Sequence, residues 1–188
     1  MPMNAIEALT TRSSMPRLKG PAPDAAVLDK LFRSALRAAD HGLMRPWRFL
    51  TIEGEALERL GDLFASAARS DNPDISAMDL EKARKKPLRA PLIVVTISSP
   101  RENPKVPEFE QDLSAAAATQ NMLVAAFAEG LGAMWRTGSM AYHPIVKQGL
   151  NLAEHEKIIG FLYLGLPDAP GKRLCEEDPA SFVQAWRG

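Results

Sequence analysis

The sequence has little cysteine, and its single residue of this kind, Cys175, sets an early limit. A lone cysteine excludes an intrachain disulfide and any zinc or iron–sulfur site built from several thiolates of one chain. The three histidines, His41, His143 and His155, have no partners at the spacing of metal ligands. We therefore expect no metal centre, and the cysteine usage fits a reducing compartment such as the cytoplasm.

Long apolar runs and excess charge of one sign are also missing. No stretch approaches the roughly 20 apolar residues that a membrane-spanning helix needs, and the first residues lack the basic and apolar regions of a signal peptide. The 23 lysines and arginines are balanced by 23 aspartates and glutamates, so no overall positive field attracts polyanions. These absences predict a cytoplasmic protein without a membrane or nucleic-acid partner.

The common catalytic signatures are absent as well. The sequence contains no phosphate-binding P-loop, no H-E-x-x-H zinc motif and no G-x-S-x-G nucleophile elbow. Gly130-Leu131-Gly132 resembles the first half of a dinucleotide fingerprint, but it follows a predicted helix and has Trp135 in place of the third glycine. A helix C-cap is the plainer interpretation of these glycines.

What the chain does contain is enough apolar material for one packed core. Its 188 residues are 46% hydrophobic, which predicts a single domain over residues 1–188. The tail of about residues 166–188 carries Phe182, Val183 and Trp186 but has too little around it to fold alone. We expect this tail to pack on a neighbouring surface such as a partner subunit.

The spacing of apolar residues predicts a mixture of helices and strands. Helical spacing covers 5–10, 24–39, 55–69, about 75–86 and 108–130, and a short helix starts at 144. Strand-like runs cover 47–52, 92–97, 133–136 and 157–164. The run 92–97 suits a central strand that is buried on both faces. Because the strands do not alternate regularly with helices, the expected class is α+β.

Two of these predicted helices carry further expectations. The longest has its apolar residues on one stripe, namely Phe109, Leu113, Ala116, Leu123, Phe127 and Leu131, and its Ala115–Ala118 block of small side chains permits close backbone approach. Near the helix at 75–86, a basic cluster is interleaved with Asp79 and Glu81, which predicts an exposed helix face of mixed charge. Its members are Lys82, Arg84, Lys85 and Lys86.

Two clusters combine cations with groups suited to an anion. At a helix end, Arg12 and Ser13 precede Ser14, and a guanidinium with hydroxyls can hold a phosphate monoester. The alternative is a solvated helix end. Arg37 and His41 lie four residues apart and can either face an anion or polar ring edge, or bind the helix C-terminal carbonyls.

Two further clusters contain tryptophan. Pro46-Trp47 opens a predicted strand, where core packing is the simpler role for the indole. Trp135-Arg136-Thr137-Gly138 ends another strand, and an arginine in an otherwise buried strand needs either a ligand or a salt bridge.

Taken together, these segments resemble the nitroreductase family of flavoproteins and its small, compact branch of NAD(P)H nitroreductases. The resemblance rests on Arg-Ser near the N-terminus, on Arg-Ala-Ala-Asp-His-Gly-Leu-Met-Arg-Pro-Trp-Arg-Phe, and on Gly-Leu-Gly-Ala-Met-Trp-Arg-Thr-Gly. It extends from about residue 5 to residue 166 and includes the strand around 157–165.

The resemblance implies a nitroreductase-like α+β fold, with a central mixed or antiparallel sheet wrapped by helices, and a homodimer that binds FMN between its subunits. Arg12 and Ser13 would hold the flavin phosphate, and Arg37 and His41 would add further contacts. The segment Trp135, Arg136 and Thr137 would complete the site, from the opposite subunit. Thr11 stands where the family usually has arginine and is included in the site by its position.

The resemblance also implies an activity. Electrons would pass from NADH or NADPH to the flavin and then to a nitroaromatic, quinone or related small acceptor, in a ping-pong cycle that needs no catalytic acid–base pair. The nicotinamide would meet a helix segment that comprises Ala125, Ala126, Phe127, Ala128, Glu129 and Gly130. Two alternatives remain, namely a flavin storage or sensor module without turnover, and a dimeric scaffold without ligand.

Overall fold

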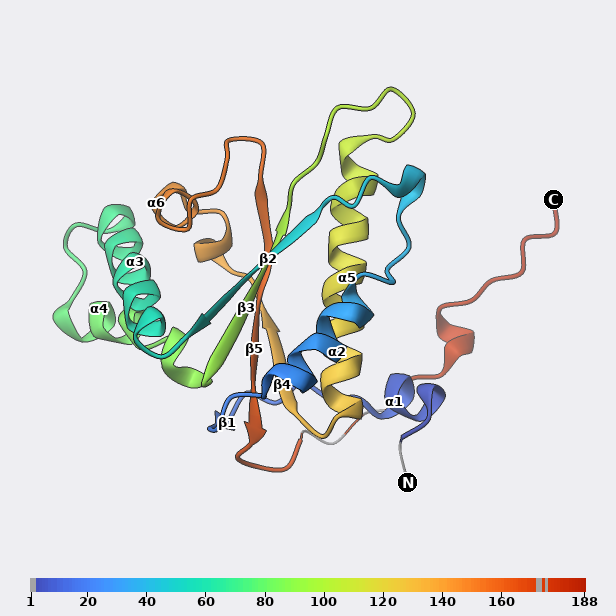
Figure 1. Cartoon of the computed structure of the whole chain (residues 1–188), viewed down its shortest axis with the longest axis horizontal. Helices are drawn as coiled ribbons and strands as arrows, with labels where there is room; N and C mark the ends of the chain where they lie inside the picture. The colour runs from blue at the N-terminus through green and yellow to red at the C-terminus, as the bar shows by residue number, and fades with distance from the viewer. Residues whose placement is uncertain (1–2, 172–173, 175) are drawn as a thin grey trace.

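An antiparallel sheet lies between two helical layers (Figure 1). The computed structural model describes residues 3–171, 174 and 176–188, so Cys175 lies outside the described residues. Its helices are α1 (Ala5–Thr11), α2 (Ala25–Ala35), α3 (Glu55–Asp71), α4 (Ala77–Arg84), α5 (Glu108–Ala128) and α6 (Pro144–Gly149). Its strands are β1 (Leu18–Lys19), β2 (Trp47–Glu53), β3 (Leu92–Ser98), β4 (Gly132–Arg136) and β5 (Lys157–Pro167).

The sheet is organised around β3 and β5. The strand order is β1-β5-β3-β2, β4 also pairs with β5, and every paired neighbour is antiparallel. Short 3-10 helices η1 (His41–Leu43), η2 (Pro87–Arg89), η3 (Ser139–Ala141) and η4 (Pro179–Ser181) join or follow these elements. The predicted α+β class is confirmed, and the two-residue strand β1 is an element that the apolar pattern missed.

Strand β3 separates two hydrophobic cores. Successive side chains of a strand point to opposite faces, and all seven residues of β3 are buried. Ile93 and Val95 pack with α3 and α6, whereas Leu92 and Val94 pack with α2 and α5. The prediction of a central strand buried on both faces is therefore confirmed.

The long helix α5 buries only part of the predicted stripe, with Leu123 buried as expected. Phe109 and Leu113 are 69% and 52% exposed, so the prediction that they belong to the core stripe is wrong. The buried face consists mainly of small residues, with Ala115 and Ala118 fully buried, and these let the helix backbone approach the sheet closely. Met122 and Leu123 are buried further along the helix, whereas Phe109 and Leu113 near its start point outward.

Helix α2 begins as predicted but ends early. Asp24 Oδ1 accepts a hydrogen bond from the Val27 N–H at 2.8 Å, which confirms the predicted N-cap. The helix ends at Ala35 rather than near residue 39, because the N–H groups of Arg37 and Ala38 bond to carbonyls only three residues back. The tighter turn redirects the chain into η1.

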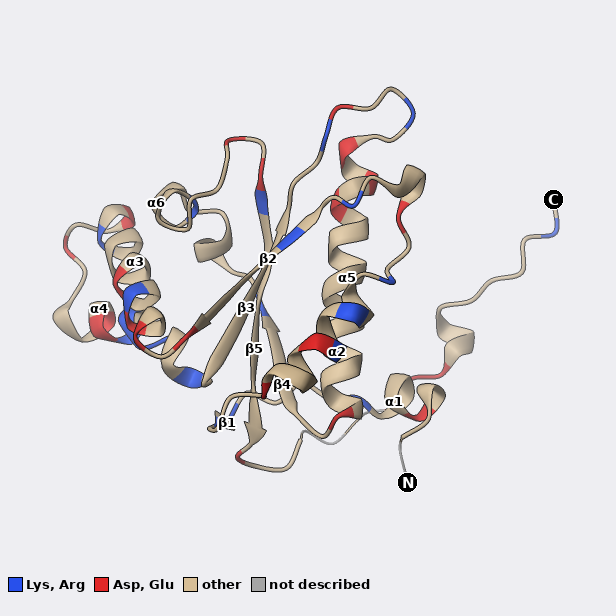
Figure 2. Ribbon diagram, viewed as in Figure 1, with Lys and Arg blue, Asp and Glu red and all other residues tan. Residues whose placement is uncertain are grey.

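Most of the predicted basic cluster forms an exposed face of mixed charge (Figure 2). Helix α4 is shorter than the predicted range of about 75–86. Three cations of the cluster pair with nearby carboxylates on α3 and α4: Lys82 with Asp79, Arg84 with Asp62 and Glu81, and Lys85 with Glu81. Lys86 differs, because it follows the helix and lines a pocket. No helix of the described chain is long and apolar enough to cross a bilayer.

An ion pair joins β2 to the turn before β5 across the end of β3. Arg48 Nε donates to Glu156 Oε1 at 2.7 Å, and Arg48 Nη2 donates to Oε2 at 2.5 Å. Glu156 is buried and also accepts from the Ala153 N–H. The hydrogen bonds from Arg48 lower the pKa of the Glu156 carboxyl to about 2.

This lowered pKa predicts a specific acid sensitivity. The pair contributes on the order of 2–3 kcal/mol above pH 4.5, and this contribution is lost as the pH falls toward 2, because the unfolded state then binds a proton that the folded state does not. Denaturant unfolding at several pH values measures the slope. Glu156→Gln should remove that slope and lower neutral-pH stability, whereas the exposed Glu154→Gln should keep both. An unchanged slope in Glu156→Gln would show that other groups control the acid response.

Candidate functional site

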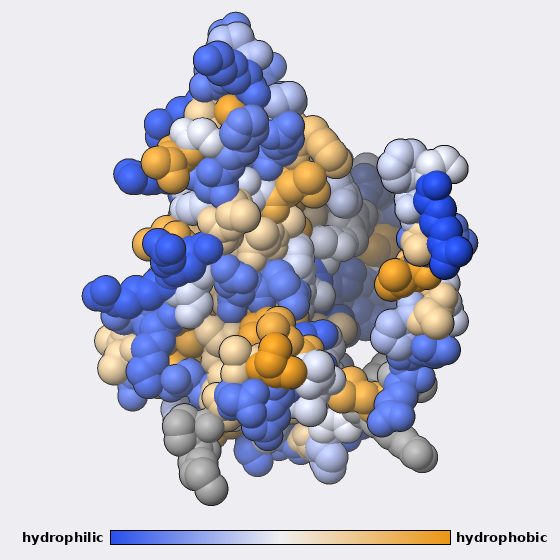
Figure 3. All heavy atoms as spheres, turned by 90° about the vertical axis from the view of Figure 1, so that its right-hand side faces the viewer, coloured by the Kyte–Doolittle hydropathy of each residue, from blue (hydrophilic) through white to orange (hydrophobic). Residues whose placement is uncertain are grey.

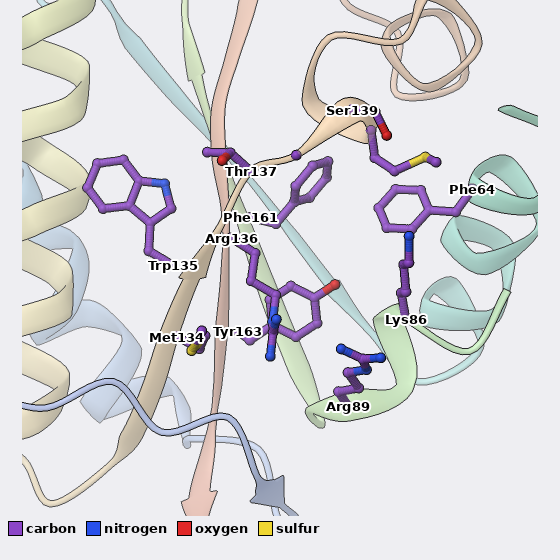
Figure 4. A pocket seen from close by; sticks show the side chains of 12 residues that line it. Phe64, Lys86, Arg89, Met134, Trp135, Arg136, Thr137, Ser139, Phe161 and Tyr163 are labelled. Atoms are coloured by element: carbon purple, nitrogen blue, oxygen red, sulfur yellow. The ribbon is translucent and has the colours of Figure 1, made fainter. Parts of the chain in front are cut away.

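A pocket of about 370 Å³ lies where β4 ends, between η3, β5, α3 and the α4–β3 connection (Figure 4). Three aromatic rings form much of its wall, from Phe64, Phe161 and Tyr163. Trp135, Arg136, Thr137, Gly138 and Ser139 also line it, so the cluster at the end of the predicted strand 133–136 borders a cavity. The structure thus joins this cluster to residues that are distant in sequence.

The pocket is lined by cations without carboxylates. Lys86, Arg89 and Arg136 face it, and no aspartate or glutamate of the described chain is among its lining residues. None of these three side chains makes an ion pair with a described residue. The pocket therefore has a positive potential that favours an anionic group.

Arg136 is held against Tyr163 in a way that leaves one donor unused. The guanidinium carbon lies 5.4 Å from the centroid of the Tyr163 ring, which is a cation–π distance. The Nε atom of Arg136 is buried and has no hydrogen-bond partner within the described residues. A buried N–H without an acceptor costs about 1–3 kcal/mol, so this atom marks a place for a ligand acceptor.

Tyr163 remains a neutral hydrogen-bond donor in this surrounding. Burial raises the pKa of its phenol to about 12, although the nearby charges of Arg136 and Arg89 act in the opposite direction. The side chain is buried on β5 and its ring lines the pocket. Because the phenol stays protonated at neutral pH, it adds no negative charge that would neutralise the cations.

The indole of Trp135 lies across β5 on the opposite side of β4 from Arg136 (Figure 4). Its Nε1–H donates to the carbonyl oxygen of Ile159 at 3.3 Å. Gly160 permits this position, because a Cβ added there would overlap the indole Nε1 and Cδ1. The glycine therefore fixes the orientation of a predicted site residue.

Replacing Gly160 with alanine should displace Trp135. The overlap predicts a loss of about 1–3 kcal/mol in the free energy of unfolding, together with a shift in tryptophan fluorescence. In a Trp135→Ala background the same substitution should cost much less, since the overlapping ring is gone. Equal costs in the two backgrounds would show that Gly160 is not needed for the indole.

The N-terminal cluster lies beside β4. The Met15 N–H donates to the Ala133 carbonyl at 2.9 Å, which places the segment after α1 along that strand. Ser13 is half-buried, and its hydroxyl lies against Gly171, where a Cβ would overlap it. Arg12 Nη1 is 3.5 Å from Ser14 Oγ and has no ion pair with a described residue. One chain thus places the segment that follows the N-terminal cluster along β4.

Thr11 is less available than its sequence position implies. It is the exposed last residue of α1, and its hydroxyl donates to the Glu7 carbonyl oxygen at 2.7 Å. The helix backbone therefore already uses the one proton that this side chain can donate.

Arg37 and His41 do not reach the pocket of their own chain. Arg37 is exposed and lines a separate groove of about 580 Å³ between α1, α2 and α5. His41 lies 2.5 Å from Glu110, through its Nδ1 and the glutamate Oε2, at the start of α5. The structure brings neither residue to Trp135–Thr137.

The helix geometry places some residues of the predicted nicotinamide segment on the surface and others in the core. Ala125, Ala128 and Glu129 line the groove that also contains Arg37. Ala126 is fully buried in the core, and Glu129 pairs with Lys30 at 2.7 Å. Only the outward face of the segment is open to a ligand.

Comparison with known proteins accounts for this arrangement. The pattern of the Nitroreductase family matches residues 9–166, which is most of the chain. The chain is also 41% identical, over 96% of its own length and 98% of the relative's, to the Escherichia coli (strain K12) protein named "Putative NAD(P)H nitroreductase YdjA". The chain belongs to the nitroreductase family.

Solved structures agree with this assignment of the fold. A nitroreductase-like family protein from Bacillus cereus superposes with a TM-score of 0.81 at 21% identity, and the match covers 98% of this chain and 97% of that one. A nitroreductase with bound FMN from Bacteroides fragilis gives a TM-score of 0.76 at 19% identity, with coverage of 98% and 100%. The resemblance seen in the sequence motifs is therefore confirmed for family and fold.

Sequence reasoning missed several residues of this pocket, three of which are polar and distant from β4 in the sequence. Lys86 belongs to a mixed-charge run that predicts only an exposed helix face, and no motif surrounds Arg89. Tyr163 lies in a predicted strand and has no feature that separates it from the other strand residues. A partial signal existed for Lys86. It is the last cation of its cluster and directly precedes Pro87, which ends the helical pattern and turns the chain toward β3.

Proposed function

We propose that this nitroreductase is an FMN-dependent oxidoreductase that uses NADH or NADPH to reduce nitroaromatic, quinone or related small acceptors in a ping-pong cycle. The observation that carries the proposal is the meeting of two segments at β4. The segment that follows Arg12 and Ser13 lies along the strand through Met15, and Trp135–Thr137 borders an aromatic-walled pocket that contains an unpartnered Arg136 N–H.

The residues present fit the chemistry of FMN. Arg12 and Ser13 offer a charged and a neutral donor for a phosphate, while Arg136 and Thr137 offer polar groups for the edge of a flat ring. When bound, FMN would accept a hydride from the nicotinamide and pass two electrons to the acceptor, so that a nitro group takes up two protons and loses water. The protein residues bind and orient the reactants.

We further propose that the working unit is a homodimer with a composite site. Arg37 and His41 face away from the pocket of their own chain, so a second copy would have to bring its Arg37 and His41 to the flavin. The neighbouring positions of Arg12 and Trp135 favour their contribution from one subunit together. This division differs from the expectation that the opposite subunit supplies Trp135–Thr137.

Mixing two inactive variants tests the composite site. Arg12→Ala and Arg37→Ala homodimers should each bind FMN weakly at both sites. Refolded or subunit-exchanged mixtures should regain tight binding at up to one site per mixed dimer, because that site contains both native arginines. Flavin fluorescence quenching measures the tight sites. A mixture no better than its parents would show that both arginines serve a site within one chain.

The single domain of residues 1–188 is proposed to end in an arm. Beyond β5, Phe182, Val183 and Trp186 are 74%, 70% and 91% exposed, and the tail extends away from the helices and sheet. Figure 3 views this side of the molecule and shows further hydrophobic patches on it. Exposed apolar patches of this kind mark association surfaces, so we assign the tail to the partner subunit.

The nicotinamide donor is proposed to approach the outward face of the segment Ala125–Gly130, through Ala125, Ala128 and Glu129. The sequence offers no preference between NADH and NADPH.

Anaerobic reduction tests the proposed activity. The FMN-loaded protein should lose its yellow absorbance when NADH or NADPH is added without oxygen, and a nitroaromatic or quinone should restore it. Colour that persists with both donors would instead identify a flavin storage or sensor module. A colourless dimer that takes up no FMN would identify a scaffold.

A further inference from the structure

The pocket beside β4 contains three cations, Lys86, Arg89 and Arg136, none of which is among the residues assigned to the flavin phosphate. Lys86 and Arg89 enter it from the α4–β3 connection, opposite Arg136 (Figure 4). The adjacent Lys85 is different, since it pairs with Glu81 on the outer face of α4. Two neighbouring lysines of one connection thus have different roles, and only the unpaired one reaches the cavity.

The oxidised FMN ring carries no charge that could match these cations. The phosphate is the charged group of oxidised FMN, and the proposed function assigns it to Arg12 and Ser13. Tyr163 stays protonated, and no acidic residue of the described chain lines the pocket. Lys86 and Arg89, which make no ion pair with a described residue, are therefore available to bind a second anion.

The pocket walls also define the shape of that anion. Phe64, Phe161 and Tyr163 present rings, and Arg136 stacks on the Tyr163 face. Aromatic walls bind flat rings well, while the lysine and the arginine supply charge-assisted donors at the rim. The volume of about 370 Å³ is in the range of pockets for small organic ligands.

We propose that this pocket selects electron acceptors that carry a carboxylate or sulfonate on a flat aromatic ring, with Lys86 and Arg89 as specificity-determining residues. The inference rests on the proposed function, because Arg136 and Thr137 line this pocket and are also proposed flavin contacts. Neither residue belongs to the predicted flavin contacts, so their effect on the acceptor can be separated from their effect on FMN.

The test compares 4-nitrobenzoate with 4-nitrobenzamide, which have similar shapes but differ by one charge. The FMN-loaded protein should show a higher kcat/KM for the benzoate, and added salt should reduce the difference. Arg89→Gln and Lys86→Gln should each lower kcat/KM for the benzoate by on the order of 10-fold and change the amide by less than about twofold. The matched control Lys85→Gln should alter neither.

Two results would overturn the proposal. One is equal kcat/KM of the native protein for the two acceptors. The other is a parallel loss for both acceptors with weakened FMN binding in Arg89→Gln and Lys86→Gln, which would assign the cations to the flavin. FMN affinity is measured separately by fluorescence quenching.

Failure of the proposed function would be distinguishable. If no acceptor is reduced, calorimetry with 4-nitrobenzoate and 4-nitrobenzamide still measures binding to the same protein. Binding of the benzoate that exceeds that of the amide and declines in Arg89→Gln would support an anion-selective pocket. Equal binding, or binding of neither compound, would contradict it.

Discussion

Replacing Arg12 with alanine is expected to weaken FMN binding by roughly 10- to 100-fold while leaving the fold intact. Arg12 is half-buried, makes no ion pair with a described residue and has only a long hydrogen bond of 3.5 Å to Ser14, so its removal should cost little folding stability. One charge-assisted bond to a phosphate contributes about 1.5–3 kcal/mol, which corresponds to the stated loss. Flavin fluorescence quenching gives the dissociation constant.

The control for Arg12 lies in the same loop. Arg17 is exposed and outside the predicted flavin contacts, so Arg17→Ala should leave FMN affinity unchanged. Thr11→Arg, which recreates the usual family residue, should strengthen binding, since the present hydroxyl is already bonded to Glu7. Native affinity in Arg12→Ala would remove this residue from the phosphate site.

Truncation after residue 177 is expected to weaken the proposed homodimer by on the order of 1,000-fold or more. The deletion removes Phe182, Val183 and Trp186, which are exposed in the single chain and which the proposal places on the partner subunit. Burying such side chains contributes about 1.5–3 kcal/mol each, and a dimer has two tails. Sedimentation equilibrium measures the dissociation constant, and FMN affinity should fall with it.

A milder variant separates the tail from general effects of truncation. Trp186→Ser with Phe182→Ser keeps the chain length and should reproduce most of the weakening. Because these side chains contact little of their own chain, the thermal stability of the monomer should change by less than about 0.5 kcal/mol. A truncated protein that stays fully dimeric would contradict the role of the tail.

The sequence was a good guide where local physics decides the outcome. The β-branched run that became β3 and the Asp24 cap of α2 follow from side-chain shape and hydrogen bonding, and both are confirmed. The error in α5 has a different origin. Periodicity ranks large side chains as buried, but close packing against this sheet favoured Ala115 and Ala118 and left Phe109 outside.

The candidate site was only partly readable, because a pocket depends on which strands become neighbours. Trp135 and Arg136 could be predicted as site residues because a tryptophan and an arginine stand together at a strand end. Tyr163 lines the same cavity only because β4 pairs with β5. Arg37 shows a second limit of prediction from the sequence, because it was predicted as a site residue but does not line this pocket in its own chain. Its predicted role requires a second copy, and no property of one chain locates it at the pocket.

The central claim is that the chain binds FMN at the β4 edge, and a titration tests it most directly. Purified protein depleted of flavin should bind one FMN per chain, with quenched flavin fluorescence and with tight affinity that Arg12→Ala reduces. Absence of saturable FMN binding by the native protein, or a native affinity in Arg12→Ala together with Trp135→Ala, would contradict the account.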